Sequence, residues 1–358
     1  MKRVLSKVHT MLSAYRALSR VKDLKVVPSF IDYIKLHKAT KLSKEEYINF
    51  RFDKCSKEFR DSFLPYQKAE QYWEILNPKK NAILARDKFV GHSLFELLNI
   101  PTSSLYFAYN DEADGDDNAM VLHKPSEVVC KLKTLGVNKF VVKPAADSAH
   151  GQGVGVYSIS EFVEFGNKEG KSIEDILVGG MLLFESFVEQ TKQISQFNPS
   201  SVNTIRMMTA LYPNNEVKLF AAFIKIGRAG SCVDNAGSGG NVDCAINLET
   251  GELYNALQFN SWKDVRKIER HPDSGTQLNG QKIDNWNSIK NGVMAMQGQI
   301  PYLKTIGWDV AVSKNGPVII EINNWWDSTG QLFLGKGWHK EVKSCYDAWV
   351  KYYNHKKQ

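Results

Sequence analysis

Residues 307–327 read GWDVAVSKNGPVIIEINNWWD, and this stretch sets how the rest of the chain is interpreted. Val, Ile and Ala alternate in two apolar runs, and the Asn-Gly pair between them favours a tight turn between antiparallel strands. Polar side chains interrupt both runs, with Asp309 in the first and Glu321 and Asn323 in the second. The stretch therefore predicts a β-hairpin that carries acids within otherwise apolar strands.

The register of this hairpin predicts a metal site. A three-residue loop of residues 314–316, with Gly316 in the left-handed conformation, places Asp309 opposite Glu321, with β-carbons about 5 Å apart. Asn323 shares their face because side chains alternate with period two. Two carboxylates this close repel each other unless they hold a cation or share a proton. Two carboxylates and an amide oxygen suit Mg²⁺ or Mn²⁺; the alternative is a hairpin whose acids point to solvent.

Composition excludes several classes of protein. The chain has 358 residues, 43% hydrophobic and 24% charged, which is ordinary for a globular protein of two domains, or of one large domain with an appendage. The five cysteines never show C-x-x-C spacing, which argues against a zinc ribbon or a disulfide framework and favours a reducing cytosol. There is no apolar run of roughly 20 residues and no signal-peptide core. We expect a cytoplasmic protein.

The positive charge is confined to the N-terminal segment. Residues 1–80 hold 18 Lys and Arg against 9 Asp and Glu, a net charge of +9, whereas the remainder is at −2. Helical spacing of apolar residues predicts a basic amphipathic helix over the first twenty residues, and Ser43 with Glu46 predicts a capping box. This face would contact an anionic membrane at its inner surface, a partner protein or a second copy, or it is a solvated face of a packed helical layer. Nucleic-acid motifs are absent, and the oligomeric state stays open.

A glycine-rich stretch, KFVVKPAADSAHGQGVGVYSI at residues 139–159, predicts a second site. One strand ends near Lys143, a loop containing Gly151 and Gly153 follows, and a second strand begins. Because a strand follows the loop, this is neither a Walker A loop nor a Rossmann fingerprint. A flap of this kind can cover phosphates with its backbone N–H groups, and Lys143 would add a charge. The alternative is an ordinary hairpin loop.

The flap with its lysine, followed downstream by the acidic hairpin, resembles the ATP-grasp superfamily over about residues 81–345. The resemblance implies an α+β fold, in which two α+β subdomains clamp ATP and an N-terminal helical segment precedes them. It divides the chain into a basic helical segment, residues 1–80, and an ATP-grasp domain, residues 81–358. Within that domain, the flap subdomain covers about residues 138–188 and the metal-binding subdomain about residues 195–345.

The resemblance also assigns roles to single residues. Asp309 and Glu321-x-Asn323 match the family's magnesium triad, Lys143 matches its nucleotide-binding lysine, and Lys88 in ARDKF matches an earlier lysine that contacts ATP phosphates.

The segment LLFESFVE, residues 182–189, matches the family's connection between subdomains, which holds adenine. There Glu185, Ser186 and Val188 would pair with the base, and Glu189 would hold the ribose hydroxyls. The family therefore implies ATP and Mg²⁺, or Mn²⁺, as cofactors.

Three further stretches resemble the sugar-transfer-associated branch of this superfamily, which is linked to bacterial cell-surface polysaccharide synthesis: NTIRMMTAL at 203–211, NAGSGGNVDCAINLETGEL at 235–253 and IGWDVAVSKNGPVIIEINN at 306–324. The implied activity is an ATP-dependent carboxylate–amine ligase that works through an acyl phosphate. The implied product is an amide between an amino acid or amine and a uronic acid or similar carboxylate of a glycan precursor.

Two basic residues in predicted strands complete the candidate site. The family places Arg206 on the acyl phosphate, where its planar guanidinium matches the oxygens, and Lys225 is a similar case; the alternative for Arg206 is a solvated sheet face. Other functions weighed are a phosphotransferase on the same scaffold, a nucleotide-binding protein without catalysis and a retaining glycosidase. The glycosidase has no use for Lys143 or Lys88.

Overall fold

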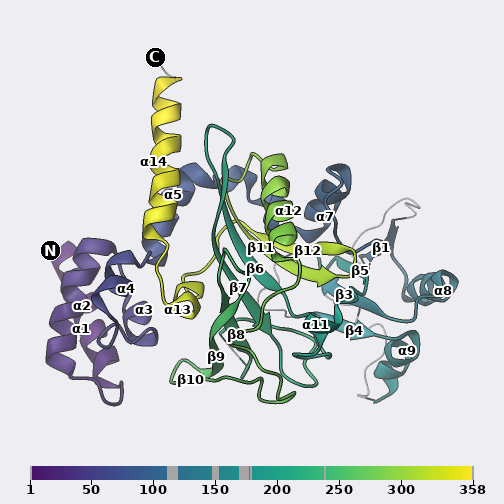
Figure 1. Ribbon diagram of the computed structural model, residues 1–358, viewed down its shortest axis with the longest axis horizontal. Helices are drawn as coiled ribbons and strands as arrows, with labels where there is room; N and C mark the ends of the chain where they lie inside the picture. The colour runs from purple at the N-terminus through teal and green to yellow at the C-terminus, as the bar shows by residue number, and fades with distance from the viewer. Residues whose placement is uncertain are drawn as a thin grey trace.

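Two β-sheets with helices around them form an α+β fold (Figure 1). The structure, a computed structural model, describes residues 2–110, 120–146, 153–168, 177, 180–237 and 239–356. The expected fold class and the N-terminal helices are confirmed.

The N-terminal helices gather at one end of the molecule (Figure 1). They are α1 (Lys2–Ser19), α2 (Val26–Thr40), α3 (Lys44–Asn49), α4 (Lys57–Ser62) and α5 (Tyr66–Leu76). The predicted capping box of Ser43 and Glu46 opens α3. Aromatic residues such as Tyr47, Phe52 and Phe59 give α1 to α4 a core of their own. In contrast, α5 packs along the C-terminal helix α14 (His339–His355) and against the larger sheet.

The first sheet has five strands in the order β2-β1-β5-β3-β4. Their bounds are Val121–Leu122, Leu105–Tyr109, Leu182–Ser186, Phe140–Pro144 and Gly155–Tyr157. Helices α8 (Pro125–Leu135) and α9 (Ile159–Lys168) cover one face, where Phe140, Val142 and Phe184 are buried. Because side chains alternate along a strand, Lys143 and Glu185 lie on the opposite face.

The second sheet has seven strands in the order β10-β9-β8-β7-β6-β11-β12. Their bounds are Asp264–Lys267, Leu253–Ser261, Val242–Ile246, Val217–Ile226, Ile205–Leu211, Thr305–Ser313 and Gly316–Asn323. Helix α12 (Trp286–Gln299) covers one face, and apolar residues such as Met207, Ile224 and Trp308 form the core there. Alternation sends their polar neighbours to the other face.

The hairpin of β11 and β12 differs from the expected one in its loop. Gly316, with φ of 110°, pairs with Ser313, so the loop has two residues rather than three. Asp309 nevertheless lies opposite Glu321, as predicted, because Ile320 is an extra residue in β12 that shifts the register between the two ends of the hairpin.

Short helices complete the fold. They are η1 (Lys79–Asn81), α6 (Ile83–Arg86), α7 (Lys88–Leu97), α11 (Lys192–Ser195) and α13 (Gly330–Leu334). None of the helices in the described ranges combines the length and apolar character that crossing a bilayer requires.

The N-terminal helices are held against the segment that follows β12. The Gln331 side-chain oxygen accepts hydrogen bonds from the backbone N–H of Leu64 at 2.8 Å and of Trp338 at 2.9 Å. Ser328 donates to the buried Glu46 carboxylate at 2.9 Å. The division at residue 80 stays a prediction.

Candidate active site

A pocket lies where α7 meets β3 and β5 of the first sheet and β12 of the second. It is lined by Lys88 at the start of α7, by Lys143 and Glu185 from β3 and β5, and by Glu321 from β12. Four residues that the sequence assigned to ATP or metal binding, spread over more than half of the chain, thus lie around one cavity.

Lys143 and Glu185 form a buried ion pair in this pocket. The Lys143 Nζ lies 2.8 Å from Glu185 Oε1, and the Ser103 hydroxyl donates to Glu185 Oε2 at 2.6 Å. Both charged side chains are less than a tenth exposed. Glu185 is therefore well placed to orient Lys143, in addition to the predicted contact with adenine. Ser103, which the sequence analysis missed, holds the Glu185 carboxylate from behind the pocket lining.

The position of Lys88 follows from the start of α7. Asp87 caps this helix, accepting hydrogen bonds from the N–H groups of Phe89 at 2.9 Å and Val90 at 3.1 Å. The Lys88 N–H donates to the Ala145 carbonyl at 2.7 Å, which ties the helix to the end of β3. The two lysines thus line the pocket from linked elements.

The predicted adenine segment continues from β5. The Ser186 N–H donates to the Ser104 carbonyl at 2.8 Å, so this donor is already engaged. The backbone of Val188 forms no hydrogen bond within the described ranges, and Glu189 is exposed. Gly153 has φ of 74°, which favours glycine, whereas Gly151 lies outside the described residues.

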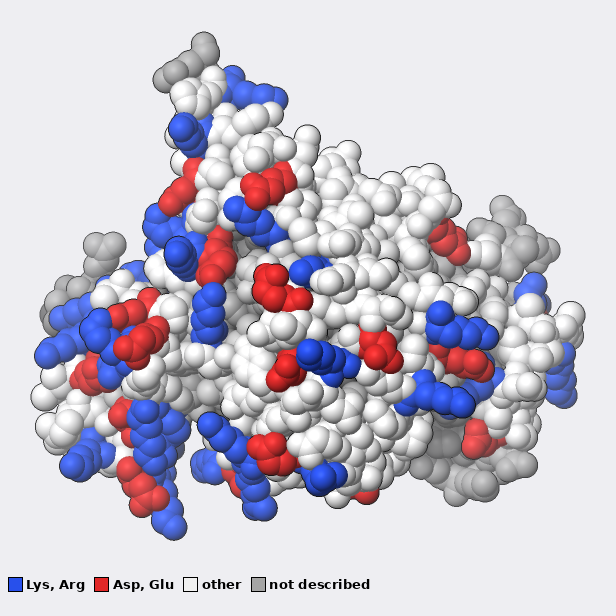
Figure 2. Space-filling model, viewed as in Figure 1, with Lys and Arg blue, Asp and Glu red and all other residues white. Residues whose placement is uncertain are grey.

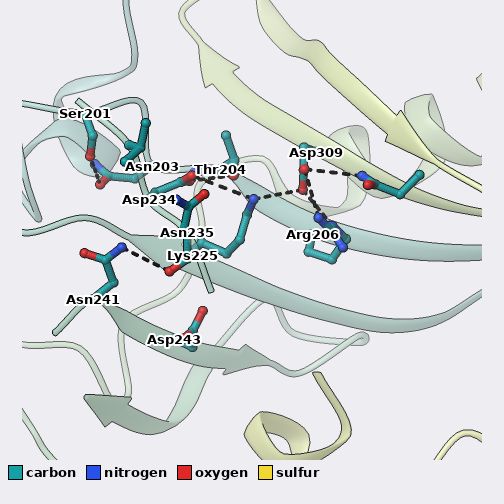
Figure 3. Close-up of polar contacts among 12 residues, drawn as sticks. Ser201, Asn203, Thr204, Arg206, Lys225, Asp234, Asn235, Asn241, Asp243 and Asp309 are labelled. Carbon is teal, nitrogen blue, oxygen red and sulfur yellow. Dashed lines mark hydrogen bonds and ion pairs between the residues drawn. The ribbon is translucent and has the colours of Figure 1, made fainter. Parts of the chain in front are cut away.

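Asp309 is the centre of a buried polar cluster on the second sheet (Figure 3). Arg206 binds it with two hydrogen bonds, from Nε at 2.7 Å and Nη2 at 2.9 Å, and Lys225 Nζ lies 3.2 Å from its Oδ1. Burial alone would raise the pKa of Asp309, but the charges of Arg206 and Lys225 outweigh burial and hold the pKa below its ordinary value. The two predicted catalytic cations therefore contact a predicted metal ligand.

The pKa of Glu321 is shifted in the opposite direction from that of Asp309. Burial and the charge of Asp309 raise the pKa of the Glu321 carboxyl, against a smaller opposing effect of Lys88. A raised pKa of this kind is typical of two neighbouring carboxylates that repel each other because nearby cations do not fully neutralise them. A divalent cation between them would relieve the repulsion.

Asn323 would complete the set of metal ligands. Its Nδ2 donates to the Gly307 carbonyl at 3.3 Å and lies 3.5 Å from Asp309 Oδ2, so its oxygen would face a cation after the amide turns over. No group of three His, Cys, Asp or Glu side chains suited to a metal occurs in the described ranges. The donor set of two carboxylates and one amide fits Mg²⁺ once Asp309 exchanges its contacts with Arg206 and Lys225 for the ion.

The comparison with protein families identifies the family of this chain. The family model described as sugar-transfer associated ATP-grasp matches residues 67–346. The chain belongs to this family. The part of the chain that matches the family model begins within α5, the helix that packs on the larger sheet.

Solved structures similar to this ATP-grasp chain include the D-cycloserine synthetase DcsG, with 11% identity, coverage of 80% of this chain and 82% of that chain, and a TM-score of 0.43. A D-alanine–D-alanine ligase from Bacillus anthracis shows 10% identity, coverage of 76% and 69%, and a TM-score of 0.41. The D-alanyl-alanine synthetase A from Vibrio cholerae shows 12% identity, coverage of 76% of this chain and 67% of that chain, and a TM-score of 0.45. No curated protein sequence matches this chain.

Two further buried acids, Asp234 and Asp243, lie beside the predicted residues of the second sheet. Asp234 is buried beside Thr204, whose N–H and hydroxyl donate to its Oδ2 at 2.7 and 2.6 Å, and its Oδ1 lies 3.7 Å from Lys225. Asp243 on β8 pairs with Lys225 across the sheet and accepts a hydrogen bond from the Gly237 N–H at 3.0 Å.

Burial raises the pKa of both acids. Burial raises the pKa of Asp234, although Lys225 opposes it, and burial raises the pKa of Asp243 well above its ordinary value. Asp243 interrupts an apolar strand as Asp309 does, so the same signal in the sequence could have found it. Asp234 lies outside a strand and carries no such signal.

Proposed function

We propose that this ATP-grasp protein is an ATP- and Mg²⁺-dependent ligase that joins a carboxylate to an amine. The observation that carries the proposal is the pocket between the two sheets, whose lining brings Lys88 and Lys143 together with Glu321. Two cations suit the phosphates of ATP, and an acid beside them suits the Mg²⁺ that accompanies ATP.

The chain's own residues have distinct roles in this proposal. Lys88 and Lys143 bind the phosphates, and Glu185 holds Lys143 in place. Asp309, Glu321 and Asn323 would hold Mg²⁺, which neutralises charge on the phosphate oxygens. Val188 offers free backbone groups to adenine, and Glu189 is the candidate for the ribose hydroxyls.

Arg206 and Lys225 would serve the chemical steps. A carboxylate oxygen of the substrate attacks the γ-phosphorus, the bond to the β-phosphate bridging oxygen breaks, and ADP leaves. The amine nitrogen then attacks the acyl carbon, the bond to phosphate breaks, and the nitrogen loses a proton as the amide forms. Both steps build negative charge on oxygens, which fixed cations stabilise.

The proposed substrates are a uronic acid or another carboxylate of a glycan precursor and an amino acid or amine. The sugar-transfer description of the family supports this choice. The test is ADP release from ATP, screened over uronic acids and amino acids in pairs. Turnover that needs both partners supports a ligase; turnover with one hydroxyl-bearing acceptor supports a phosphotransferase; and nucleotide binding without turnover of any pair supports a non-catalytic protein.

Replacing Lys143 by alanine should weaken ATP binding about ten- to a hundredfold, because a charge-assisted hydrogen bond to phosphate is lost. Isothermal titration calorimetry with ATP measures this. Since Lys143→Ala leaves the buried Glu185 carboxylate without its partner, the double variant Lys143→Ala/Glu185→Gln is the control, and it should bind ATP as weakly. Unchanged ATP affinity in both variants would mean that the lysine is structural.

Replacing Arg206 by alanine should leave ATP affinity nearly intact and lower kcat about 10²-fold or more, because its proposed partner forms only during the reaction. Arg206→Lys keeps the charge without the two-pronged geometry and should recover part of kcat. The measurements are kcat and the Kd for ATP. An unaltered kcat for Arg206→Ala would leave this arginine with a purely structural role beside Asp309.

A further inference from the structure

Helices α1 and α2 expose large apolar side chains around the place where the two helices touch. The rings of Tyr15 and Phe30 meet edge to face, with centroids 5.5 Å apart. Met11 lies one helical turn before Tyr15, Val27 lies one turn before Phe30, and Ile31 lies one turn after Val27. The exposed fractions of Met11, Tyr15, Val27 and Ile31 are 43%, 41%, 57% and 51%. We call these four residues and Phe30 the α1–α2 patch.

Positive charges outnumber negative charges around the α1–α2 patch. Helices α1 and α2 contain a single acid, Asp32, and Arg60 of α4 neutralises it at 2.5 Å. Arg16 directly follows Tyr15, and Lys35 lies one helical turn after Ile31. Neither side chain forms an ion pair within the described ranges. Figure 2 shows Lys and Arg side chains gathered over this end of the molecule, with some acids among them.

A hollow beside α1 adds to the positive surface. It is lined by Leu12, Ser13, Arg16, Ala17, Arg20 and Lys44. These residues bring Arg16, Arg20 and Lys44 to one concavity, and the Lys44 ammonium also lies 3.6 Å from the Glu45 carboxylate. A phosphate-bearing surface would therefore meet both a recess for its head groups and an apolar patch next to it.

We propose that the α1–α2 patch and its cations bind the surface of an anionic lipid bilayer. Apolar side chains that enter the interface, with basic side chains at the level of the lipid phosphates, are the features that hold helices on such surfaces. Exposed apolar clusters of this kind mark contact sites, and the excess of cations selects an anionic partner. In Figure 1 the two helices lie at the end of the molecule away from α7, β3 and β5, which line the proposed ATP pocket.

The test is flotation of the full chain with vesicles of phosphatidylcholine, alone or mixed with phosphatidylglycerol, at low and high salt. We expect binding to the anionic vesicles at low salt, and loss of binding on phosphatidylcholine alone or at high salt. The charge variant Arg16→Glu/Lys35→Glu and the apolar variant Val27→Ser/Ile31→Ser should each bind at least about tenfold more weakly. All four positions lie on the surface, so the variants should fold, and circular dichroism verifies this.

Matched controls lie at the other end of the molecule. Lys131→Glu/Lys133→Glu on α8 changes charge equally, and Leu97→Ser/Leu135→Ser replaces apolar residues that are 78% and 41% exposed. Both controls should bind vesicles like the native chain. The proposal is overturned by absence of binding at low salt, or by equal losses in the controls. It is also overturned if Val27→Ser/Ile31→Ser converts a dimer to a monomer without changing vesicle binding. Vesicle binding needs no turnover, so this result and that of the ligase assay are separate.

Discussion

Replacing Glu321 by glutamine is expected to lower turnover at least about 10²-fold, in line with the loss of one strong electrostatic element from a metal site. The same change should leave the free protein as stable as before, or more stable. Burial and Asp309 raise the pKa of Glu321, which means that its charged form is disfavoured in the folded state. Removing the charge therefore removes a repulsion.

Two measurements separate these effects. Turnover is measured at saturating ATP and Mg²⁺, and stability by urea unfolding without nucleotide. Glu216→Gln, at an exposed position of the turn before β7, is the matched control and should change neither. A further readout is the rise in melting temperature on adding Mg²⁺ and ATP, which should shrink in Glu321→Gln. Nearly native turnover by Glu321→Gln would contradict the assignment of Glu321 as a metal ligand.

Replacing Asp309 by asparagine should abolish turnover to a similar degree but, unlike Glu321→Gln, should also destabilise the fold. Asp309 is the shared anionic partner of Arg206 and Lys225, and all three side chains are largely buried. Breaking a buried ion pair by removing one partner leaves uncompensated charge and costs about 3–5 kcal/mol.

Urea unfolding of Asp309→Asn measures this cost as a lower midpoint with an unchanged slope. The double variant Asp309→Asn/Arg206→Gln removes one stranded cation and should recover part of the lost stability, while turnover stays low. Equal stability of Asp309→Asn and the native chain would show that the cluster holds little of the folding free energy. Opposite stability effects at two facing carboxylates would support the charge distribution described here.

Much of the site could be predicted from local patterns. Asp309, Glu321 and Asn323 each interrupt an apolar strand, and Lys143 ends a strand before a glycine-rich loop. The period-two alternation that identifies such residues depends only on neighbours along the chain. The facing of Asp309 and Glu321 was predicted correctly, although the three-residue loop used to derive it was wrong.

The register of that hairpin depends on contacts from elsewhere. The Ile319 N–H donates to the Pro101 carbonyl at 2.8 Å, and the Ile319 carbonyl accepts from the Thr102 hydroxyl at 2.8 Å. These bonds hold the backbone of β12 next to Ile320, the extra residue. Nothing in the hairpin's own sequence signals this, because the partner segment at Pro101 and Thr102 is more than two hundred residues away in the chain.

The sequence by itself determined the strands of the acidic hairpin and the polar positions within them, since these follow from alternation and turn chemistry over a few adjacent residues. The α+β class followed from the resemblance of its motifs to the ATP-grasp superfamily. The tertiary structure alone decided which charges meet. Strand β6 lies between β7 and β11, and this order brings Arg206 to Asp309 across 103 residues and places Lys225 between Asp309 and Asp234. Strand order is set by the packing of whole sheets and helices, so the electrostatic partners of a residue are a property of the assembled fold.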